Sequence, residues 1–194
     1  MENFKEFLST NLNVSQEELS TCEDLILVKN VKKGEFLLHA GEICNYYFFV
    51  ENGLLRMFSV DKNGKEHVIL FAPENWIISD RSSLFFNEKS PYYIEAIEDS
   101  EVIFAKNDFF LNISERFPQS AAKNERLLHR HINNLQSRVN SLLGDTAEQR
   151  YVDFVKKYPN VLARVPQWMV ASYLGITPES LSRVRKELVK KKAP

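Results

Sequence analysis

The 194-residue chain is 44% hydrophobic and 12% aromatic, enough apolar material for a sizeable core in one or two domains. Its apolar runs are far too short to cross a bilayer, and the N-terminus lacks the basic and then apolar pattern of an export signal. We therefore expect a cytoplasmic protein with no membrane partner. Cys22 and Cys44 have no CxxC or Cys/His spacing, which predicts neither an iron–sulfur cluster nor a structural zinc and favours free buried thiols over a disulfide.

The net charge of −1 hides a segregation of charge along the chain. Residues 144–194 hold ten Lys or Arg and five Asp or Glu, a net charge of +5, so the first 143 residues carry −6. A basic quarter joined to an acidic body is typical of a module that approaches a polyanion such as nucleic acid. A solvated basic tail, KELVKKK, is the alternative.

The first half of the chain predicts helix and then strands. Residues 1–26 have a helical composition, with Ser15 as a helix N-cap. From about Val31 to Ala105, short β-branched and aromatic runs alternate with turns at KKGE, AGE, ENG and DKNGK, which predicts a compact antiparallel sandwich or barrel. These runs are EFLLH, YYFFV, GLLRMFSV, KEHVILF, YYIEAI and EVIFA.

A long helix is predicted from Gln119 to Leu143, with Gly144 as its stop. Its apolar residues recur at steps of four and three, as in the seam of a coiled coil. The seam consists of Leu128, Ile132, Leu135, Val139 and Leu142. We expect it to pair with a second copy in a homodimer, because a face buried within one chain is usually wider; packing wholly within one chain is the alternative. Leu127 and Leu143 form a flanking line that can lie on the β domain.

Three shorter helices follow. DTAEQRYVDFVKKYP predicts one that is capped by Thr146 or Asp145. QWMVASYLGITPESLSRVRKEL then predicts two helices joined by a tight turn. Gly175 can adopt the left-handed conformation that ends the first, while Thr177 as N-cap and Pro178 in the first turn fix the start of the second. This arrangement indicates a helix-turn-helix.

The last helix has an apolar face of Leu181, Val184 and Leu188 and an opposite face that is mainly basic. Arg183 can bind guanine in bidentate fashion, and Glu179 can accept from cytosine or orient Arg183. An exposed ion pair between these two residues is the alternative. The residues that we expect to contact DNA are Thr177, Glu179, Ser180, Ser182, Arg183, Lys186 and Lys190, with the lysines suited to phosphate.

From about Lys29 to Lys190 the chain resembles the Crp/Fnr family of bacterial transcription regulators, most specifically in ASYLGITPESLSRVRKEL, and the segment from LLGDTAEQ to ESLSR is similar to a subgroup common in Bacteroidetes. The resemblance implies an α+β fold. An antiparallel, cyclic-nucleotide-binding-like β-roll would occupy residues 1–117, and a dimerisation helix would occupy residues 118–144. Residues 145–194 would form an all-helical helix-turn-helix domain that lacks most of the family's wing. Phosphate contacts of the wing would fall to Lys190, Lys191 and Lys192.

The resemblance also implies the function, which is transcription regulation by a homodimer bound to a palindromic operator in double-stranded DNA. Its recognition helices would enter successive major grooves about 34 Å apart. In the family, the positions that match Glu179 and Arg183 contact bases. Whether RNA polymerase and a small-molecule effector are further partners stays open.

The effector region departs from the family pattern. Cyclic-AMP-binding members have a Gly-Glu-Leu turn and then an Arg-Ser or Arg-Thr pair, where this chain has WIISDRSSLFFNEKSPYYIEA. A cyclic phosphate needs a cation, and Asp80 and Glu88 oppose Arg81 and Lys89 there, so we predict weak or no cyclic AMP binding and leave the effector unknown. The candidate effector pocket, by matching position, is Ser79, Asp80, Arg81, Ser82, Lys89 and Ser90.

No catalytic or metal site is predicted. His39 and His67 lie on separate strands, and His129 and His131 point in nearly opposite directions on one helix. The chain has no phosphate loop, dinucleotide fingerprint or nucleophile elbow, so we expect no enzyme activity. Haem ligation by one histidine, as in some relatives, stays open. The alternative function is a β-roll that binds a ligand or a protein without binding DNA.

Overall fold

The computed structural model describes residues 1–192, apart from the side chains of Gln16 and Lys192. Helices precede the β-roll: α1 (Glu2–Leu12), α2 (Gln16–Ser20) and the short 3-10 helix η1 (Glu23–Leu25). Ser15 caps α2 as predicted, since its hydroxyl accepts from the Glu18 N–H and the Glu18 carboxylate accepts from the Ser15 N–H.

The β-roll consists of two four-stranded sheets, in the orders β1-β8-β3-β6 and β2-β7-β4-β5. Its strands are β1 (Ile26–Val31), β2 (Phe36–Leu38), β3 (Tyr46–Asn52), β4 (Leu55–Val60), β5 (Glu66–Ala72), β6 (Ile77–Ile78), β7 (Tyr93–Ala96) and β8 (Ser100–Lys106). Every pairing is antiparallel, which confirms the predicted roll. The sequence pattern predicts six of these strands but neither β6 nor most of β1.

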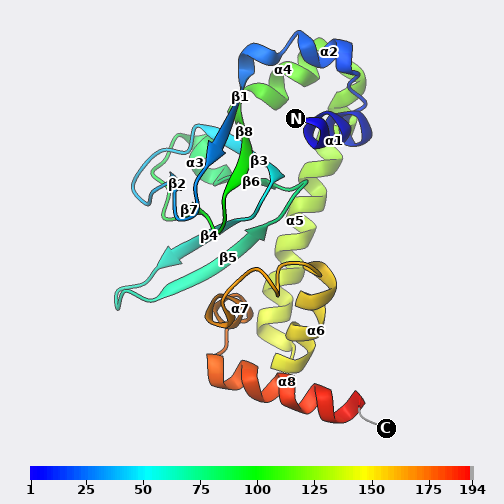
Figure 1. Cartoon of the computed structure of the whole chain (residues 1–194). Coiled ribbons are helices and arrows are strands. Elements are labelled where there is room, and N and C mark those ends of the chain that lie inside the picture. Colours follow the sequence, from blue (N-terminus) through cyan, green and yellow to red (C-terminus); the bar gives the residue numbers. More distant parts are fainter. Residues whose placement is uncertain (193–194) are drawn as a thin grey trace.

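The remaining helices are α3 (Arg81–Phe86), α4 (Phe109–Arg116), the 3-10 helix η2 (Pro118–Ser120), α5 (Ala121–Gly144), α6 (Ala147–Lys157), α7 (Gln167–Leu174) and α8 (Pro178–Lys192). Helix α5 runs the length of the molecule, from α1 and α4 at one end to α6 and α8 at the other (Figure 1). It begins two residues later than predicted and includes Gly144 as its last residue, so Gly144 does not stop it. Thr146, not Asp145, caps α6.

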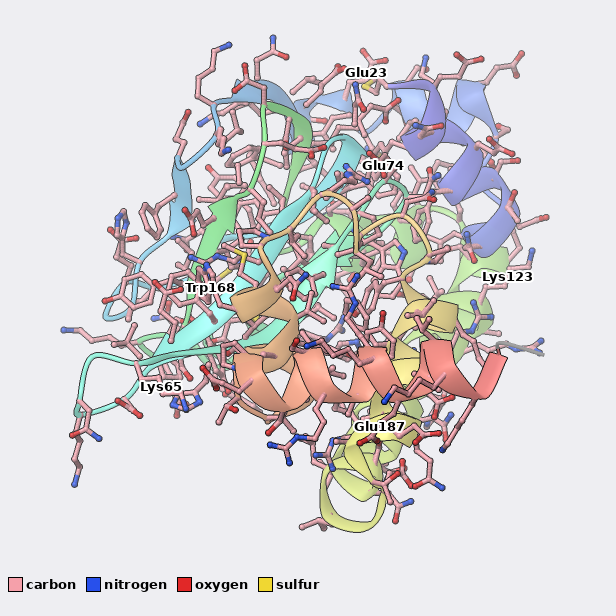
Figure 2. The ribbon with its side chains drawn as sticks, turned by 60° about the horizontal axis from the view of Figure 1, so that its bottom comes forward. Glu23, Lys65, Glu74, Lys123, Trp168 and Glu187 are labelled. Carbon is pink, nitrogen blue, oxygen red and sulfur yellow. The ribbon has the colours of Figure 1, made fainter. Side chains whose placement is uncertain are left out.

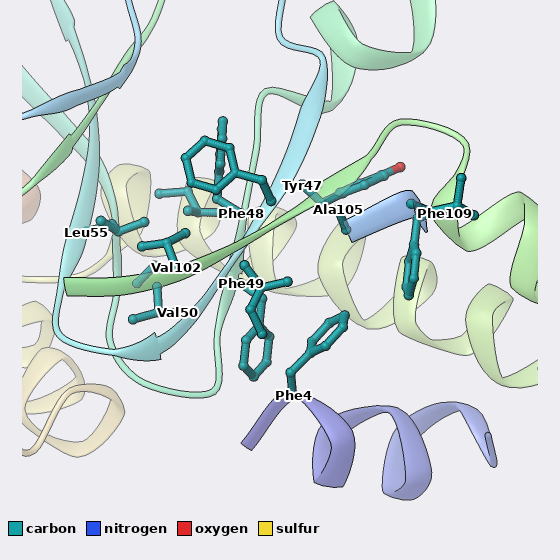
Figure 3. Packing of buried hydrophobic residues seen from close by; sticks show 14 of the residues in the cluster. Phe4, Tyr47, Phe48, Phe49, Val50, Leu55, Val102, Ala105 and Phe109 are labelled. Atoms are coloured by element: carbon teal, nitrogen blue, oxygen red, sulfur yellow. The ribbon is translucent and has the colours of Figure 1, made fainter. Parts of the chain in front are cut away.

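The core of the β-roll extends over the N-terminal helices. The Phe4 ring of α1 lies 5.0 Å from that of Phe49 on β3 and 5.8 Å from that of Phe109 on α4, measured between centroids (Figure 3). Leu127 packs against this core, as predicted. Leu143 is 83% exposed, so its predicted packing on the β domain is wrong.

A second core joins the β-roll to the C-terminal helices. Measured between ring centroids, Phe71 of β5 lies 6.1 Å from Phe154 on α6, 6.0 Å from Tyr158, which directly follows α6, and 5.7 Å from Tyr173 on α7. All four side chains are buried. The helical module therefore shares its hydrophobic core with the edge strand β5, so α7 is fixed against the sheet. Both cysteines are free and buried, as expected.

Candidate nucleic-acid interface

Helices α7 and α8 form the predicted helix-turn-helix. Gly175 ends α7 with φ at 67°, and its N–H donates to the Ser172 carbonyl at 3.1 Å. The Thr177 hydroxyl then accepts from the Ser180 N–H at 3.3 Å, and Pro178 is the first residue of α8. The left-handed glycine, the cap and the proline thus set the turn as the sequence predicts.

The two faces of α8 differ as predicted. Leu181 is fully buried in the core that it shares with residues of α6 and α7, and Val184 is 8% exposed. The opposite face leaves Glu179, Arg183 and Lys186 exposed to solvent. Lys190 is also exposed, and Thr177 begins the same stripe. Viewed from this end of the molecule, α8 lies in front of the other elements, with Glu187 beside the stripe (Figure 2).

The basic side chains of this stripe have no partner of opposite charge. Within residues 1–192, Arg183, Lys186 and Lys190 make no ion pair, so the alternative of a Glu179–Arg183 pair is not formed. The Thr177 hydroxyl lowers the pKa of Glu179 below its usual value, so this carboxylate is ionised at neutral pH. The stripe is therefore charged, hydrated and accessible.

Lys191 differs from its neighbour Lys190. Its Nζ lies 2.8 Å from both carboxylate oxygens of Glu148 and thus ties α8 to α6. The side chain is engaged within the chain, unlike the free phosphate-binding lysine expected there. The side chain of Lys192, the third lysine named for this role, lies outside the described residues.

The predicted seam forms one line of exposed apolar side chains along α5. Its five residues are 39% to 56% exposed, and no residue of α5 is fully buried. Monomeric proteins rarely leave a contiguous apolar stripe of this length in water. The members are Leu128, Ile132, Leu135, Val139 and Leu142.

The residues of the candidate effector pocket have separate environments. Asp80 is 4% exposed and caps α3: its Oδ1 accepts from the N–H groups of Ser82 (3.1 Å) and Ser83 (3.3 Å). Its Oδ2 is buried without a partner among the described residues. The Arg81 guanidinium lies 5.6 Å from the centroid of the Tyr47 ring. Ser79, just before the cap, is half-buried.

Lys89 and Ser90 lie at the other end of this segment. The Ser90 hydroxyl is buried and accepts from the Tyr92 N–H at 3.1 Å, whereas Lys89 is exposed. Lys89 borders a surface hollow of about 560 Å³ whose lining includes Cys44, Tyr46 and Phe48. The other five candidate effector residues do not line it. The six are therefore not gathered in this cavity.

The histidines are dispersed. His67 Nε2 lies 2.9 Å from Asp61, and exposed His129 lies 3.7 Å from Glu125. His131 is half-buried; burial first and then the positive charge of Arg81 lower its pKa. In the described part of the chain, no group of three or more His, Cys, Asp or Glu side chains is arranged to hold a metal ion. Nor is any described helix both long and apolar enough to cross a membrane.

Contacts that the sequence pattern does not predict fasten the helix-turn-helix to the β-roll. Ser172, in the middle of α7, donates its hydroxyl to the Glu66 carbonyl and accepts from the Val68 N–H, both at 2.9 Å. This hydroxyl satisfies the open edge of β5. No spacing in the sequence indicates that a serine of one helix meets a strand about 100 residues earlier.

Two arginines reinforce this boundary. Arg164, in the loop before α7, donates to Glu74 at 2.8 Å and also pairs with Glu98 on the β7–β8 turn. Arg56 of β4 is 4% exposed and bonds the Glu66 and Glu95 carboxylates, while its guanidinium lies 5.3 Å from the Trp168 ring of α7. Each of these cations is compensated by two carboxylates.

The chain combines an antiparallel β-roll, a long helix with an exposed apolar seam and a helix-turn-helix with an exposed basic stripe. This combination is typical of a regulator in which the β-roll is the sensor part and the second helix of the helix-turn-helix can enter a groove of DNA. Residues 28–117 match the cyclic nucleotide-binding domain family. The chain is similar to transcription regulators of the Crp/Fnr family.

Named relatives cover most of the chain. The transcriptional activator protein anr of Pseudomonas aeruginosa is 27% identical over 188 residues, which is 89% of this chain and 75% of the relative. The anaerobic regulatory protein of Pasteurella multocida is 23% identical over 189 residues, or 91% and 68%.

Solved structures share the fold. FixK2 from Bradyrhizobium japonicum aligns with a TM-score of 0.73 at 20% identity, over 86% of this chain and 85% of that one. The catabolite activator protein of Thermus thermophilus aligns with a TM-score of 0.58 at 19% identity, over 95% and 87%. At these identities, the likeness establishes the arrangement of β-roll, long helix and helix-turn-helix, which confirms the predicted fold class.

Proposed function

We propose that this protein is a sequence-specific DNA-binding transcription regulator that acts as a homodimer. The observation that carries the proposal is the stripe on α8, where exposed Arg183, Lys186 and Lys190 have no partner within residues 1–192. Such a stripe on the second helix of a helix-turn-helix is placed to enter the major groove. Named relatives that are transcriptional activators support the same reading.

We assign separate roles to the residues of the stripe. Arg183 reads guanine through its bidentate guanidinium, and Glu179 accepts from a cytosine amino group. Lys186 and Lys190 bind phosphates and give affinity without sequence preference. The remaining hydroxyls, which bind phosphate or base edges, belong to Thr177, Ser180 and Ser182.

The dimer forms through the seam on α5. Pairing buries five side chains that are otherwise 39% to 56% exposed. Residues 118–144 thus form the dimerisation segment, between a sensor domain at 1–117 and a DNA-binding domain at 145–194. Two α8 helices about 34 Å apart would then contact the two halves of a palindromic operator. We place this complex in the cytoplasm, with RNA polymerase as its further partner.

The effector of the β-roll is not cyclic AMP in this proposal. Ser90 stands near the position where the cyclic-AMP-binding pattern has an arginine, and its hydroxyl is already bonded to the Tyr92 N–H at 3.1 Å. Lys89 is exposed, whereas Asp80 is buried as the cap of α3. A cyclic phosphate held beside the buried Asp80 carboxylate would be repelled by it, and the exposed Lys89 borders a hollow that Asp80 does not line.

Selection from random duplex DNA by the purified protein, with and without cyclic AMP, tests the proposal. We expect one enriched palindrome that is the same in both arms. The double variant Glu179→Ala/Arg183→Ala is the control, because both side chains are exposed and the fold should survive. A folded wild-type protein that enriches no motif at low salt would instead support the alternative, a β-roll that binds a ligand or protein only. A palindrome enriched only with cyclic AMP would contradict the effector assignment.

A further inference from the structure

The last two turns of α5 hold the end of α7. The Nη2 of Arg138 donates a hydrogen bond to the Tyr173 carbonyl, and its guanidinium carbon lies 3.7 Å from the centroid of the Tyr173 ring. Tyr173 is the second-last residue of α7, so this carbonyl belongs to the helix end, where a cation is favourable. One side chain therefore fixes both the backbone and the ring of Tyr173.

Arg138 differs from Arg164 and Arg56, the two arginines that fasten the helix-turn-helix to the β-roll. Arg164 and Arg56 each pair with two carboxylates, whereas Arg138 makes no ion pair within residues 1–192. Burial lowers the pKa of Arg138, and no carboxylate compensates for the lost hydration. The contacts that compensate this cation include the Tyr173 carbonyl and ring, so its position depends on that of α7.

Leu142, one turn further along α5, contacts the turn itself. A Cβ added to Gly175 would lie 3.3 Å from Leu142 Cδ2, so this glycine allows the close approach as well as the left-handed φ of 67°. Together, Arg138 and Leu142 fix residues 173–175. Helix α8 begins only three residues later, at Pro178, so its start is fixed to α5 as well.

The same two turns of α5 carry the end of the seam. Leu142 is 42% exposed while it contacts Gly175, and Leu135 and Val139 are exposed on either side of Arg138 in the sequence. If the seam pairs as proposed above, the dimer contact and the contact that holds the recognition helix lie on one rigid segment. Arg138 and Leu142 then help to set the distance between the two α8 helices, together with the contacts that hold α7 on β5.

We infer that Arg138 is a positioning residue that sets the spacing of the two recognition helices and thereby selects the spacer length of the operator. The inference rests on the proposed function. Adding or removing one base pair shifts the second half-site by about 3.4 Å and turns it by about 35°. A dimer with fixed helices should reject such operators, and a dimer with a released helix should accept them.

The test measures affinity for the selected palindrome and for versions with the spacer one base pair longer or shorter. We expect the wild type to lose about tenfold or more with either change, and Arg138→Met to lose less than about twofold. Base substitutions within a half-site should cost both proteins the same, because Glu179 and Arg183 are untouched. A variant that changes the response to spacer length but not the response to base substitutions has lost helix positioning and not its general structure.

Three controls complete the design. Arg130→Met removes the same charge from an exposed position on α5 and should keep the spacer preference. Arg138→Lys keeps the charge but not the planar stacking group, so its preference should stay relaxed; it also replaces Arg138→Met if that variant fails to fold. Sedimentation should show a dimer in each case.

The outcomes are distinct. An unchanged spacer preference in both Arg138 variants, or an equal loss of affinity for all spacers, would overturn the positioning role while leaving the proposed function intact. If the wild type enriches no palindrome at all, the proposed function fails, and this inference fails with it.

Discussion

The positive charges on the two sides of the helix-turn-helix have different partners. On the side of α7 that faces the β-roll, Arg164 and Arg56 each bond two carboxylates of the same chain. On the outer side of α8, Arg183 is exposed and makes no ion pair within residues 1–192. Cations that are satisfied within the chain hold the module in place, while cations that are left in water are available to an external anion. Substitutions on the first side should change stability, and substitutions on the second should change binding.

The largest effect is expected at the seam on α5. Like the outer face of α8, the seam is exposed to solvent and available to a partner outside the chain. Leu135→Asp places a carboxylate from each copy in the dimer interface, where it would lose its hydration. We expect monomers at micromolar concentration in sedimentation and a loss of about 100-fold or more in operator affinity, because the two half-sites are no longer bound together. Gln136→Asp, an exposed control one residue along, should remain dimeric.

Thermal unfolding of the Leu135→Asp monomer shows whether the substitution affects only association or also the stability of the single chain. Leu135 is 49% exposed, so the monomer's own core should lose little. If the variant sediments as a dimer, the seam does not mediate association and the operator geometry needs another explanation.

Arg183→Ala tests the outer face directly. The variant loses one bidentate base contact in each half-site, so the binding free energy for the selected operator should weaken by about 1–3 kcal/mol per half-site, or roughly 5- to 150-fold for each. Affinity for unrelated DNA should fall much less, and base preference should relax at one position of each half-site. The unfolding midpoint should stay unchanged because the side chain is exposed. Binding titrations on operator and scrambled duplexes measure this, and equal losses on both would remove Arg183 from base reading.

Arg164→Met tests the inner side. It leaves Glu74 and Glu98, which are 33% and 36% exposed, without their shared cation. We expect a loss of about 1–2 kcal/mol in the free energy of unfolding, below the range for fully buried pairs because these carboxylates are partly hydrated. Base preference should not change. Lys156→Met, which breaks the exposed pair with Asp153, should cost less than about 0.5 kcal/mol.

The loss in Arg164→Met should depend on pH. Burial alone would raise the pKa of Glu74, but the hydrogen bonds from Arg164 outweigh it and hold the pKa below its usual value. A depressed pKa contributes stability above the unfolded-state pKa, about 4.3, and that contribution disappears as the pH falls through the folded-state value. The gap between wild type and variant in denaturant unfolding should therefore narrow at acid pH. A constant gap would indicate that packing, not charge, dominates.

Local rules explain what the sequence could predict. The cap at Thr177, the left-handed Gly175 and the steps of three and four on α5 and α8 depend on neighbours within one or two turns, so they could be inferred without the fold. Arg183 was found in the same way, from helical spacing and charge. Strand β6, only two residues long, carries no such local signal.

The residues that fasten the modules could not be predicted, because their partners are remote in sequence. Ser172 bonds β5 at a separation of 104 to 106 residues, and Arg164 meets Glu74 at a separation of 90. Arg138 carries no local signal of its role, because its partner Tyr173 lies 35 residues away in the sequence. The prediction for Leu143 is wrong for a related reason: a helical wheel gives the direction of a side chain but not what packs against it.

The smallest expected effect concerns two adjacent lysines, one exposed without an ion-pair partner in the described residues and one paired within the chain. Lys190 is exposed and unpaired within the described residues, whereas Lys191 Nζ lies 2.8 Å from both Glu148 carboxylate oxygens. Lys190→Ala should weaken binding to every DNA sequence about equally and reduce the slope of log affinity against log salt by about two, since the dimer loses one phosphate contact in each half-site.

Lys191→Ala is the matched control, with the same charge change one residue away. It should change the salt slope less, because its ammonium group is already neutralised by Glu148 and does not displace counterions from DNA. It should instead loosen the contact between α8 and α6, a surface ion pair that contributes little to stability. A larger slope change for Lys191 than for Lys190 would mean that DNA draws Lys191 away from Glu148. In that case, an ion pair within the chain would not distinguish a lysine that stabilises the fold from one that binds DNA at this end of α8.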